Sequence, residues 1–248
     1  MTTTLIFIKS CNASHTCNNI LILINYDYSS SSAVAFLRAP FAHAIITHLD
    51  ISAARAADGV VLAASQADLD ADNVGEINCN FYPENRDGSQ VPRTTKPPMA
   101  RSKVRHAGDL VAMVVAETRQ QAMDALDLIE VDYDPLDAVT DVYDAMRPEA
   151  PQLHDEYVNN IVFDWEAGDI NNARAKLDAA LSEGATLVEI DVINSRVMPN
   201  AMETRPVVAM PSEEIGGLRV WLPSQGPVGL AGQIATALGY EDEQLQVL

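Results

Sequence analysis

The stretch from Leu110 to Pro135 constrains the fold more than any other part of the sequence. It opens with the unbroken apolar run Leu110–Ala116, which is typical of a buried strand. Thr118 is placed as a helix N-cap, and residues 130–133 read as a second strand. Between them the apolar residues share one helical face: Ala122, Ala125, Leu126 and Ile129. This strand–helix–strand order is an α/β signal and predicts a layered domain.

Before this stretch, short apolar runs alternate with turn residues. The runs predict strands: Ala33–Leu37, Ala44–Leu49 and Val60–Ala64. Ser52 is placed to cap a short helix that extends to Ala57, and Gly59 follows just after its end. Residues 70–103 are rich in proline and turn residues and have little period. They predict a long irregular crossing, a feature that usually has a functional or wrapping role.

A loose polar segment from Pro148 to Asn160 predicts a linker to a second unit. In that unit Asp169 is placed to cap a helix that ends at Gly184. Its predicted apolar face consists of Ala173, Leu177, Ala180 and Leu181. Residues 188–192 then alternate between apolar and acidic side chains, the pattern of a half-buried strand.

The last part of the chain predicts a hairpin followed by a helix. Val207–Met210 and Leu218–Leu222 flank the turn at Gly216-Gly217. The helix presents Leu230, Ile234 and Leu238 on one face and stops at Gly239. Gln244–Leu248 begin another strand, and an end inside a strand is expected of a cut piece rather than of a natural domain boundary.

The chain is strongly acidic. Its 248 residues include 35 Asp and Glu against 16 Lys and Arg, a formal net charge of −19 at pH 7. Because such a polyanion is repelled by phosphate backbones and anionic lipid, nucleic-acid and membrane-surface functions are disfavoured. No apolar stretch is long enough to span a bilayer. Cys11, Cys17 and Cys79 form no disulfide or metal framework, so we expect a reducing, cytoplasmic environment.

The residues by themselves offer no catalytic constellation. His43 and His48 are expected on opposite faces near a strand start, as surface or interface residues rather than zinc ligands. Asp132 and Asp134 share a strand face and are expected to be solvated. Ser224 lacks the G-x-S-x-G elbow of serine hydrolases, and there is no phosphate loop or dinucleotide fingerprint.

One short segment, Ser224-Gln225-Gly226-Pro227, has a chemically useful position. It follows a predicted strand and precedes a predicted helix. Such a junction presents free backbone N–H groups at the positive end of the helix dipole. The Gln225 side chain can donate a hydrogen bond there to an oxo or anionic group. A turn with an exposed glutamine is the simpler interpretation of the same residues.

Several motifs resemble those of the large subunits of xanthine dehydrogenase, aldehyde oxidase and carbon monoxide dehydrogenase. Residues 36–44 (FLRAPFAHA) resemble the motif R-S-P-H-A-H-A, and residues 104–112 (VRHAGDLVA) resemble V-R-Y-V-G-E-P-V-A. Residues 117–136 are similar to the A-E-T to Y-E-P-L stretch that follows. The order is kept in the later matches: Gly168-Asp169, Arg196–Pro199, Met202–Arg205, Val220-Trp221 and Ser224–Pro227.

This resemblance implies an α+β fold in two parts. The first is an α/β hammerhead domain at about 33–145, and the second is the opening part of a molybdopterin-binding α+β domain at about 146–248. The implied protein is a molybdenum hydroxylase, an oxidoreductase that adds water-derived oxygen to a small substrate. The implied cofactor is molybdenum-molybdopterin. FAD and 2Fe-2S clusters are expected on medium and small partner subunits, in a dimer of heterotrimers without nucleic acid or membrane insertion.

The resemblance also assigns roles to single residues. Gln225 matches the glutamine that hydrogen-bonds the molybdenum oxo ligand, and Gly226 lies beside it, so both are expected to bind the cofactor. Arg38 and Glu203 sit in matching motifs, where structural roles are expected. No catalytic residue and no direct metal ligand is predicted in these residues. Carbon monoxide, aldehydes, purines and N-heterocycles all remain candidate substrates.

Two departures from the family pattern shape the expectations. Residues 1–32 lack the usual G-x-A-x-Y-x-x-D stretch and are interpreted as an atypical leader with one short strand at Ile20–Ile24. The chain also stops before the G-G-G-F-G loop and the downstream catalytic glutamate. We therefore expect an N-terminal fragment that is inactive alone and does not hold the cofactor stably. The alternative is a stand-alone hammerhead module that serves binding or assembly.

Overall fold

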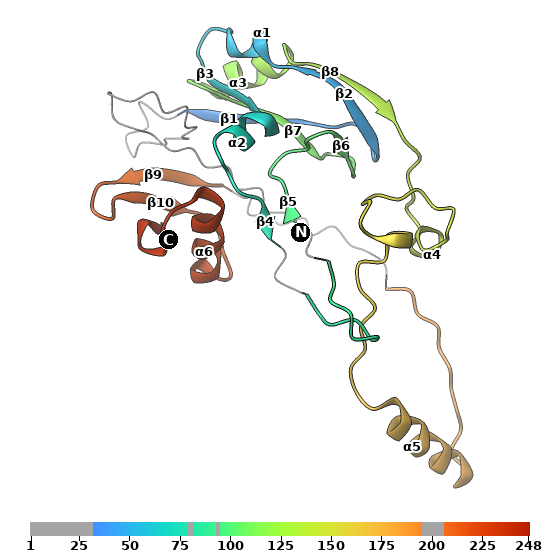
Figure 1. The fold of residues 1–248 in the computed structure, drawn as a ribbon. Helices are drawn as coiled ribbons and strands as arrows, with labels where there is room; N and C mark the ends of the chain where they lie inside the picture. Colours follow the sequence, from blue (N-terminus) through green and yellow to red (C-terminus); the bar gives the residue numbers. More distant parts are fainter. Residues whose placement is uncertain (1–31, 79–81, 93–94, 195–205) are drawn as a thin grey trace. The chain divides into compact units, whose positions relative to one another are not determined.

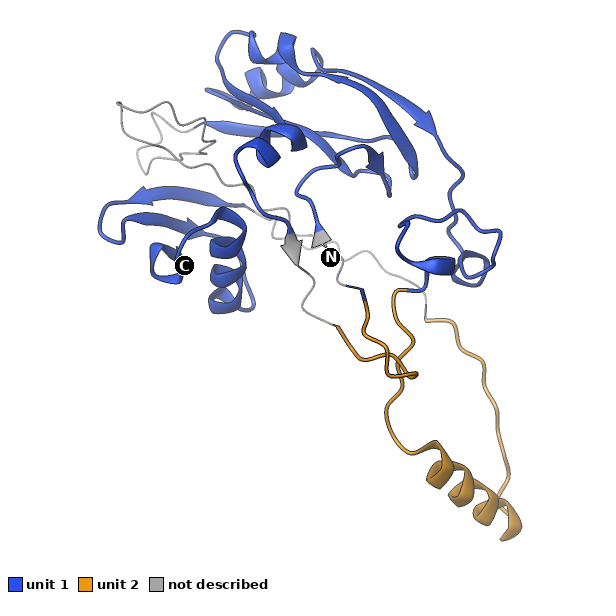
Figure 2. Cartoon of the chain, viewed as in Figure 1, with its two compact units in different colours: residues 1–81, 92–161, 205–248 blue, residues 82–91, 162–204 orange. Residues whose placement is uncertain are grey.

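The computed structural model describes residues 32–78, 82–92, 95–194 and 206–248, which form an α+β fold (Figure 1). The predicted leader, the three cysteines and the motif residues 196–205 lie outside the described residues, apart from Ser32. The chain forms two compact units (Figure 2). Unit 1 comprises residues 1–81, 92–161 and 205–248, and unit 2 comprises residues 82–91 and 162–204.

The first sheet is antiparallel and has the strand order β1-β7-β3. Its strands are β1 (Ala33–Arg38), β3 (Val60–Ser65) and β7 (Leu110–Ala116), which confirms the predicted strands. Every residue of β7 is buried because both faces of the sheet are covered. Met113 and Val115 pack with Leu69 on one face, whereas Ala112 and Val114 pack with helix residues on the other. Burial on both faces explains the unbroken apolar run.

The second sheet is also antiparallel, with the order β6-β2-β8. Its strands are β2 (Ala44–Asp50), β6 (Lys103–Val104) and β8 (Glu130–Pro135). The helix α3 (Arg119–Leu126) begins after Thr118, whose side chain accepts a hydrogen bond from the Gln121 amide, as predicted. The predicted strand–helix–strand order is present. β7 and β8 lie in different sheets, so α3 does not connect parallel neighbours.

Two short helices differ from the sequence expectations at their starts. Helix α1 (Ser52–Arg55) has Ile51, not Ser52, at its N-cap position, and the Asp50 carboxylate accepts the Ser52 amide at 2.8 Å. Helix α2 (Gln66–Ala71) was not predicted. It begins with a capping box in which Ser65 and Asp68 satisfy each other's backbone amides. The S-x-x-D spacing before an apolar residue was the signal that would have located it.

Polar side chains fix the crossing that was predicted at residues 70–103. Between α2 and β6 its described residues, 72–78, 82–92 and 95–102, are largely irregular, as predicted. Its described part contains only two short strands, β4 (Ile77–Asn78) and β5 (Thr95–Lys96). Oε1 of buried Gln66 accepts a hydrogen bond from the Met99 amide at 2.8 Å. Arg101 bonds Asp70 at 2.8 Å and also pairs with Glu76. This charge pairing lowers the pKa of Asp70, because the hydrogen bonds from Arg101 favour the carboxylate.

Gly59 is a position where the turn itself requires glycine. It follows α1 with a φ of +73°, and a Cβ there would clash with the Gln121 side-chain amide. We expect Gly59→Ala to lower the free energy of unfolding by about 1–2 kcal/mol in urea denaturation. Gly232 is the control, because it lies inside a helix and a Cβ added there would meet nothing nearer than 4.0 Å. Gly232→Ala is expected to stabilise by about 0.4–1 kcal/mol, and equal effects at both positions would contradict this account.

The C-terminal part of unit 1 is a small sheet covered by a helix. Strands β9 (Val208–Ser212) and β10 (Gly217–Trp221) form the predicted hairpin, and β11 (Leu245–Val247) pairs parallel to β10. Helix α6 (Pro227–Leu238) ends at Gly239, which has a φ of +68°. Leu218 and Val220 of the sheet pack against Ile234 of α6. None of the described helices has the length and apolarity to cross a bilayer.

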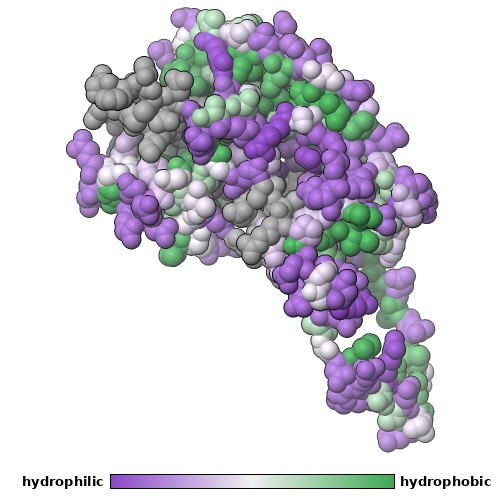
Figure 3. Space-filling model, in the orientation of Figure 1, coloured by the Kyte–Doolittle hydropathy of each residue, from purple (hydrophilic) through white to green (hydrophobic). Residues whose placement is uncertain are grey.

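Unit 2 has the predicted helix but not the predicted strand. Helix α5 (Ile170–Ser182) is capped by Asp169 and has no buried residue, and apolar side chains are visible along it in Figure 3. Val188, Ile190 and Val192 are 73%, 77% and 74% exposed and form no strand, so the half-buried strand was wrong. An alternating pattern needs a neighbouring strand for its backbone bonds, and the described part of unit 2 supplies none there.

Candidate functional site

The loop at residues 222–226 joins β10 to α6 and contains the segment singled out from the sequence. Both flanking elements are anchored. β10 lies between β9 and β11 and buries Leu218 and Val220, and α6 buries Ile234 and Ala235. A loop held between two packed elements presents its side chains from a defined position. The predicted strand-to-helix junction is therefore confirmed.

The loop carries hydrogen-bond donors without acidic neighbours in the first turn of α6. Ser224 Oγ accepts the Gly226 amide at 3.0 Å, and Gly226 is the N-cap residue of α6. Pro227 at the first helical position has no N–H, and no side chain caps the helix. The next amides, of Val228 and Gly229, therefore point outward without partners in the helix. This leaves a neutral donor set at the positive end of α6.

Gln225 and Gly226 are adjacent and exposed. Among the described residues, the Gln225 side chain has no hydrogen-bond partner, so its amide is free to donate to a bound group. A Cβ at Gly226 would meet nothing within 4 Å. The space beside the loop is open on this side. Uncharged donors of this kind fit an oxo ligand or the phosphate of a pterin cofactor, because they stabilise negative charge without adding a counter-charge.

The two motifs at residues 36–44 and 104–112 lie against each other, as their contacts show. Arg38 donates to the Gly108 carbonyl oxygen at 2.9 Å. The Ala39 amide donates to Asp109 O and the Gly108 amide donates to Ala39 O, both at 2.8 Å. Arg38 thus holds a loop, in agreement with the structural role expected for it. Glu203, the other residue expected to be structural, lies outside the described residues.

The sequence interpretation of the histidines was half correct. His48 is exposed on β2, as are Asp132 and Asp134 on β8. His43 is only 4% exposed, and its Nδ1 lies 2.8 Å from the carbonyl oxygen of Asp137. It is therefore a buried residue, not a surface one, because residues 136–137 fold back over it. Among the described residues, no three His, Cys, Asp or Glu side chains are grouped to hold a metal ion.

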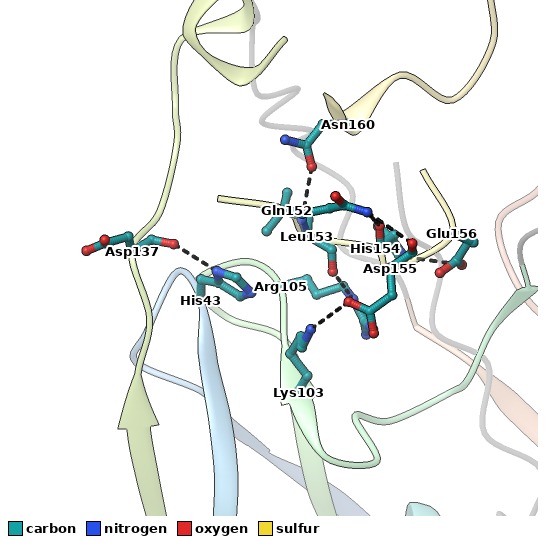
Figure 4. Close-up of polar contacts among 10 residues, drawn as sticks. All are labelled: His43, Lys103, Arg105, Asp137, Gln152, Leu153, His154, Asp155, Glu156 and Asn160. Atoms are coloured by element: carbon teal, nitrogen blue, oxygen red, sulfur yellow. Dashed lines mark hydrogen bonds and ion pairs between the residues drawn. The ribbon is translucent and has the colours of Figure 1, made fainter. Parts of the chain in front are cut away.

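Charged side chains lie within and beside residues 152–160 (Figure 4). His154 Nδ1 lies 3.7 Å from Glu156 Oε1, and the His154 ring packs edge-on against the ring of Tyr157. Burial lowers the pKa of His154, and the nearby cations Arg105 and Lys103 lower it further against the opposing effect of Glu156 and Asp155. Protonation of His154 is therefore less favourable in the folded chain than in the unfolded one.

This lowered pKa predicts acid sensitivity of residues 152–160. A histidine whose pKa is lower in the folded chain than in the unfolded chain does not change the free energy of unfolding well above pH 6.5, because it is neutral in both states. As the pH falls below 6.5, the unfolded chain binds the proton more readily, so the folded state is destabilised. We expect amide exchange of these residues, corrected for intrinsic rates, to accelerate between pH 7.5 and pH 5. His154→Gln should remove the pH dependence. A slope that is equal in the variant and in the parent would contradict the assignment to His154.

Comparison with known proteins identifies the two parts of the chain. The sequence model of the aldehyde oxidase and xanthine dehydrogenase a/b hammerhead domain matches residues 25–137. The sequence model of the molybdopterin cofactor-binding domain matches residues 153–248. The chain belongs to the xanthine dehydrogenase, aldehyde oxidase and carbon monoxide dehydrogenase large-subunit family. Members of this family are molybdenum hydroxylase large subunits, and their proteins are oxidoreductases.

The relatives of this chain are named for different substrates. The carbon monoxide dehydrogenase large chain of Afipia carboxidovorans is 29% identical over 225 residues, which cover 86% of this chain and 26% of the relative. A probable hypoxanthine oxidase of Escherichia coli O157:H7 is 39% identical over 132 residues, 52% of this chain and 13% of the relative. The chain thus spans about a quarter or less of the length of these relatives.

Solved structures agree with the family assignment. Quinoline 2-oxidoreductase from Pseudomonas putida 86 superposes with a TM-score of 0.71 at 29% identity, covering 87% of this chain and 26% of that one. The match extends over both family domains, so the fold described above is the fold of this family. The α+β fold class expected from the sequence is confirmed, with a hammerhead domain followed by the start of the cofactor-binding domain.

Proposed function

We propose that this chain forms the hammerhead domain and the first part of the cofactor-binding domain of a molybdenum hydroxylase large subunit, with Gln225 and Gly226 beside the molybdenum cofactor. The observation that carries the proposal is the succession of the two matched domains in one chain. The donor set of the β10–α6 loop supports it, because neutral donors suit a cofactor that carries oxo ligands and a phosphate.

The proposed task of the loop is to bind and orient. The Gln225 amide donates a hydrogen bond to an oxo ligand, and the Gly226 position keeps the approach to the loop open. The outward amides at the start of α6 add positive potential. When bound, the molybdenum cofactor supplies the redox chemistry that transfers a water-derived oxygen atom to the substrate. No general acid or base is assigned to the described residues.

The partners and substrates are part of the proposal. Electrons from substrate oxidation would leave through 2Fe-2S clusters and FAD on small and medium subunits, in a dimer of heterotrimers. The relatives are named for carbon monoxide, hypoxanthine and quinoline, so the substrate class includes small gases, purines and N-heterocycles, with aldehydes as a further candidate. The 248 residues alone are expected to be inactive, since they span about a quarter of the matched relatives.

Isotope labelling tests the proposed reaction. The protein purified from its native host would be incubated in ¹⁸O water with an artificial electron acceptor and a panel of carbon monoxide, aldehydes, purines and N-heterocycles. We expect one class to be oxidised with ¹⁸O in its product. Oxidation with oxygen from dissolved O₂, or no oxidation of any class, would contradict the proposal and favour a binding or assembly role.

A further inference from the structure

Residues 136–160, here named the strap, connect β8 to the start of unit 2. The strap contains only the short helices α4 (Val142–Ala145) and η1 (Val158–Asn160). Its regular structure therefore cannot hold it in place. Figure 4 shows that side chains from other parts of unit 1 reach its backbone instead.

His43 holds the beginning of the strap. The Leu136 amide donates to the His43 carbonyl at 2.9 Å, and His43 Nδ1 lies 2.8 Å from Asp137 O. A carbonyl oxygen only accepts hydrogen bonds, so Nδ1 is the donor in this contact. His43 is 4% exposed whereas Asp137 is exposed, so the bond is buried on its histidine side. Its loss would leave a buried donor and a carbonyl without partners.

Arg105 holds the middle of the strap. Its Nε donates to Leu153 O at 2.9 Å, and its own backbone amide is fixed by Asp109 Oδ2 at 3.2 Å. Nearby, Tyr157 is 3% exposed and donates from its hydroxyl to Pro92 O at 3.0 Å. Arg105 therefore holds the chain at the residue where the match to the cofactor-binding domain begins.

Asn160 closes the far end of the strap on itself. Its Oδ1 accepts the Leu153 amide at 2.9 Å, and its Nδ2 donates to Ala145 O at 2.9 Å and Pro151 O at 3.0 Å. Its φ of 56° lies in the left-handed region, which asparagine tolerates better than most residues. The strap is thus folded into one loop whose backbone is tied at both ends and in the middle.

We propose that His43 and Arg105 are positioning residues that fasten the strap to the hammerhead domain. They thereby fix the point at which the chain leaves the hammerhead domain for the cofactor-binding domain. Both residues bond backbone carbonyls, so they recognise the path of the strap and not its side chains. They come from two distant motifs, residues 36–44 and 104–112, that lie against each other. This inference concerns the folded chain and does not depend on the proposed function.

Hydrogen–deuterium exchange on the purified 248-residue chain tests the proposal. His43→Leu and Arg105→Met remove one anchor each. We expect exchange in peptides from 136–160 to accelerate about tenfold in either variant, while β7 keeps its rate, because losing one part-buried hydrogen bond opens the strap locally. His43→Asn places an amide donor near the Nδ1 position and is expected to restore exchange to within about threefold of the parent.

Lys103→Met is the matched control. Lys103 also faces the strap, but its partner Asp155 is 86% exposed at 3.4 Å, and such a pair contributes little. In Lys103→Met, the exchange of peptides from 136–160 should stay within about twofold of the parent. The proposal is overturned if both anchor variants leave the strap within that range. It is also overturned if they accelerate β7 as much as the strap, or if His43→Asn behaves like His43→Leu.

Discussion

Replacement of Gln225 by alanine is expected to lower kcat by about 10²-fold or more in the active protein, the typical cost of losing one donor to a charged reacting group. The reason is the position of the residue, exposed on the β10–α6 loop, with no partner among the described residues. For the same reason the variant should unfold within about 0.5 kcal/mol of the parent. Steady-state kinetics and urea denaturation measure the two effects separately.

Gln233 provides the control for this variant. It is an exposed glutamine on helix α6, away from the loop, so Gln233→Ala should leave kcat unchanged. Gln225→Glu keeps the size of the side chain but replaces an amide donor with a carboxylate, and we expect it to be at least as inactive as the alanine variant. Full activity of Gln225→Ala would remove Gln225 from the proposed cofactor site.

Met113→Ala should produce the largest loss of stability. Met113 is fully buried at the centre of β7, where it packs with Leu69, Met99 and Val115. Truncation removes apolar contacts and leaves a cavity between a central strand and helix α2. We expect the free energy of unfolding to fall by about 2–5 kcal/mol, measured by urea denaturation.

Met123 is the matched control, since it is a methionine on the neighbouring helix α3 that is 47% exposed. Met123→Ala should change the free energy of unfolding by no more than about 0.5 kcal/mol. A loss at Met113 no larger than the loss at Met123 would contradict the placement of β7 as the central core strand.

The local pattern predicted most of the elements because each carries its own signal. The apolar run at 110–116, the cap at Thr118 and the glycine at position 239 correspond to β7, α3 and the end of α6. Strand pairing has no such local signal. Which strands become neighbours depends on segments far apart in sequence, so the separation of β7 and β8 into two sheets was not predicted.

The errors at residues 188–192 and at His43 have the same origin. An alternating pattern indicates a strand only where a partner strand is present, and the described part of unit 2 offers none. His43 is polar and was expected at the surface or at an interface, but the strap covers it. The bond to Asp137 joins residues that are 94 positions apart in the chain. Burial by a distant segment cannot be read from neighbouring residues.

The candidate site was predicted in two steps of unequal strength. The junction of a strand and a helix around residues 224–227 follows from the local pattern, and the structure confirms it. The assignment of Gln225 as a hydrogen-bond donor to the molybdenum oxo ligand rests on the resemblance to the family and stays a prediction. The reason is physical: an oxo-binding site is assembled from several segments, and one exposed amide has no distinctive surroundings of its own.

Molybdenum analysis by mass spectrometry of the protein from its native host tests the central claim most directly. In the whole large subunit isolated from that host we expect about one molybdenum atom and one pterin per subunit after gel filtration, because a tightly held cofactor stays with the folded protein. The 248 residues expressed alone are expected to hold neither stably. A native protein purified intact and folded, with molybdenum and pterin at background, would contradict the account.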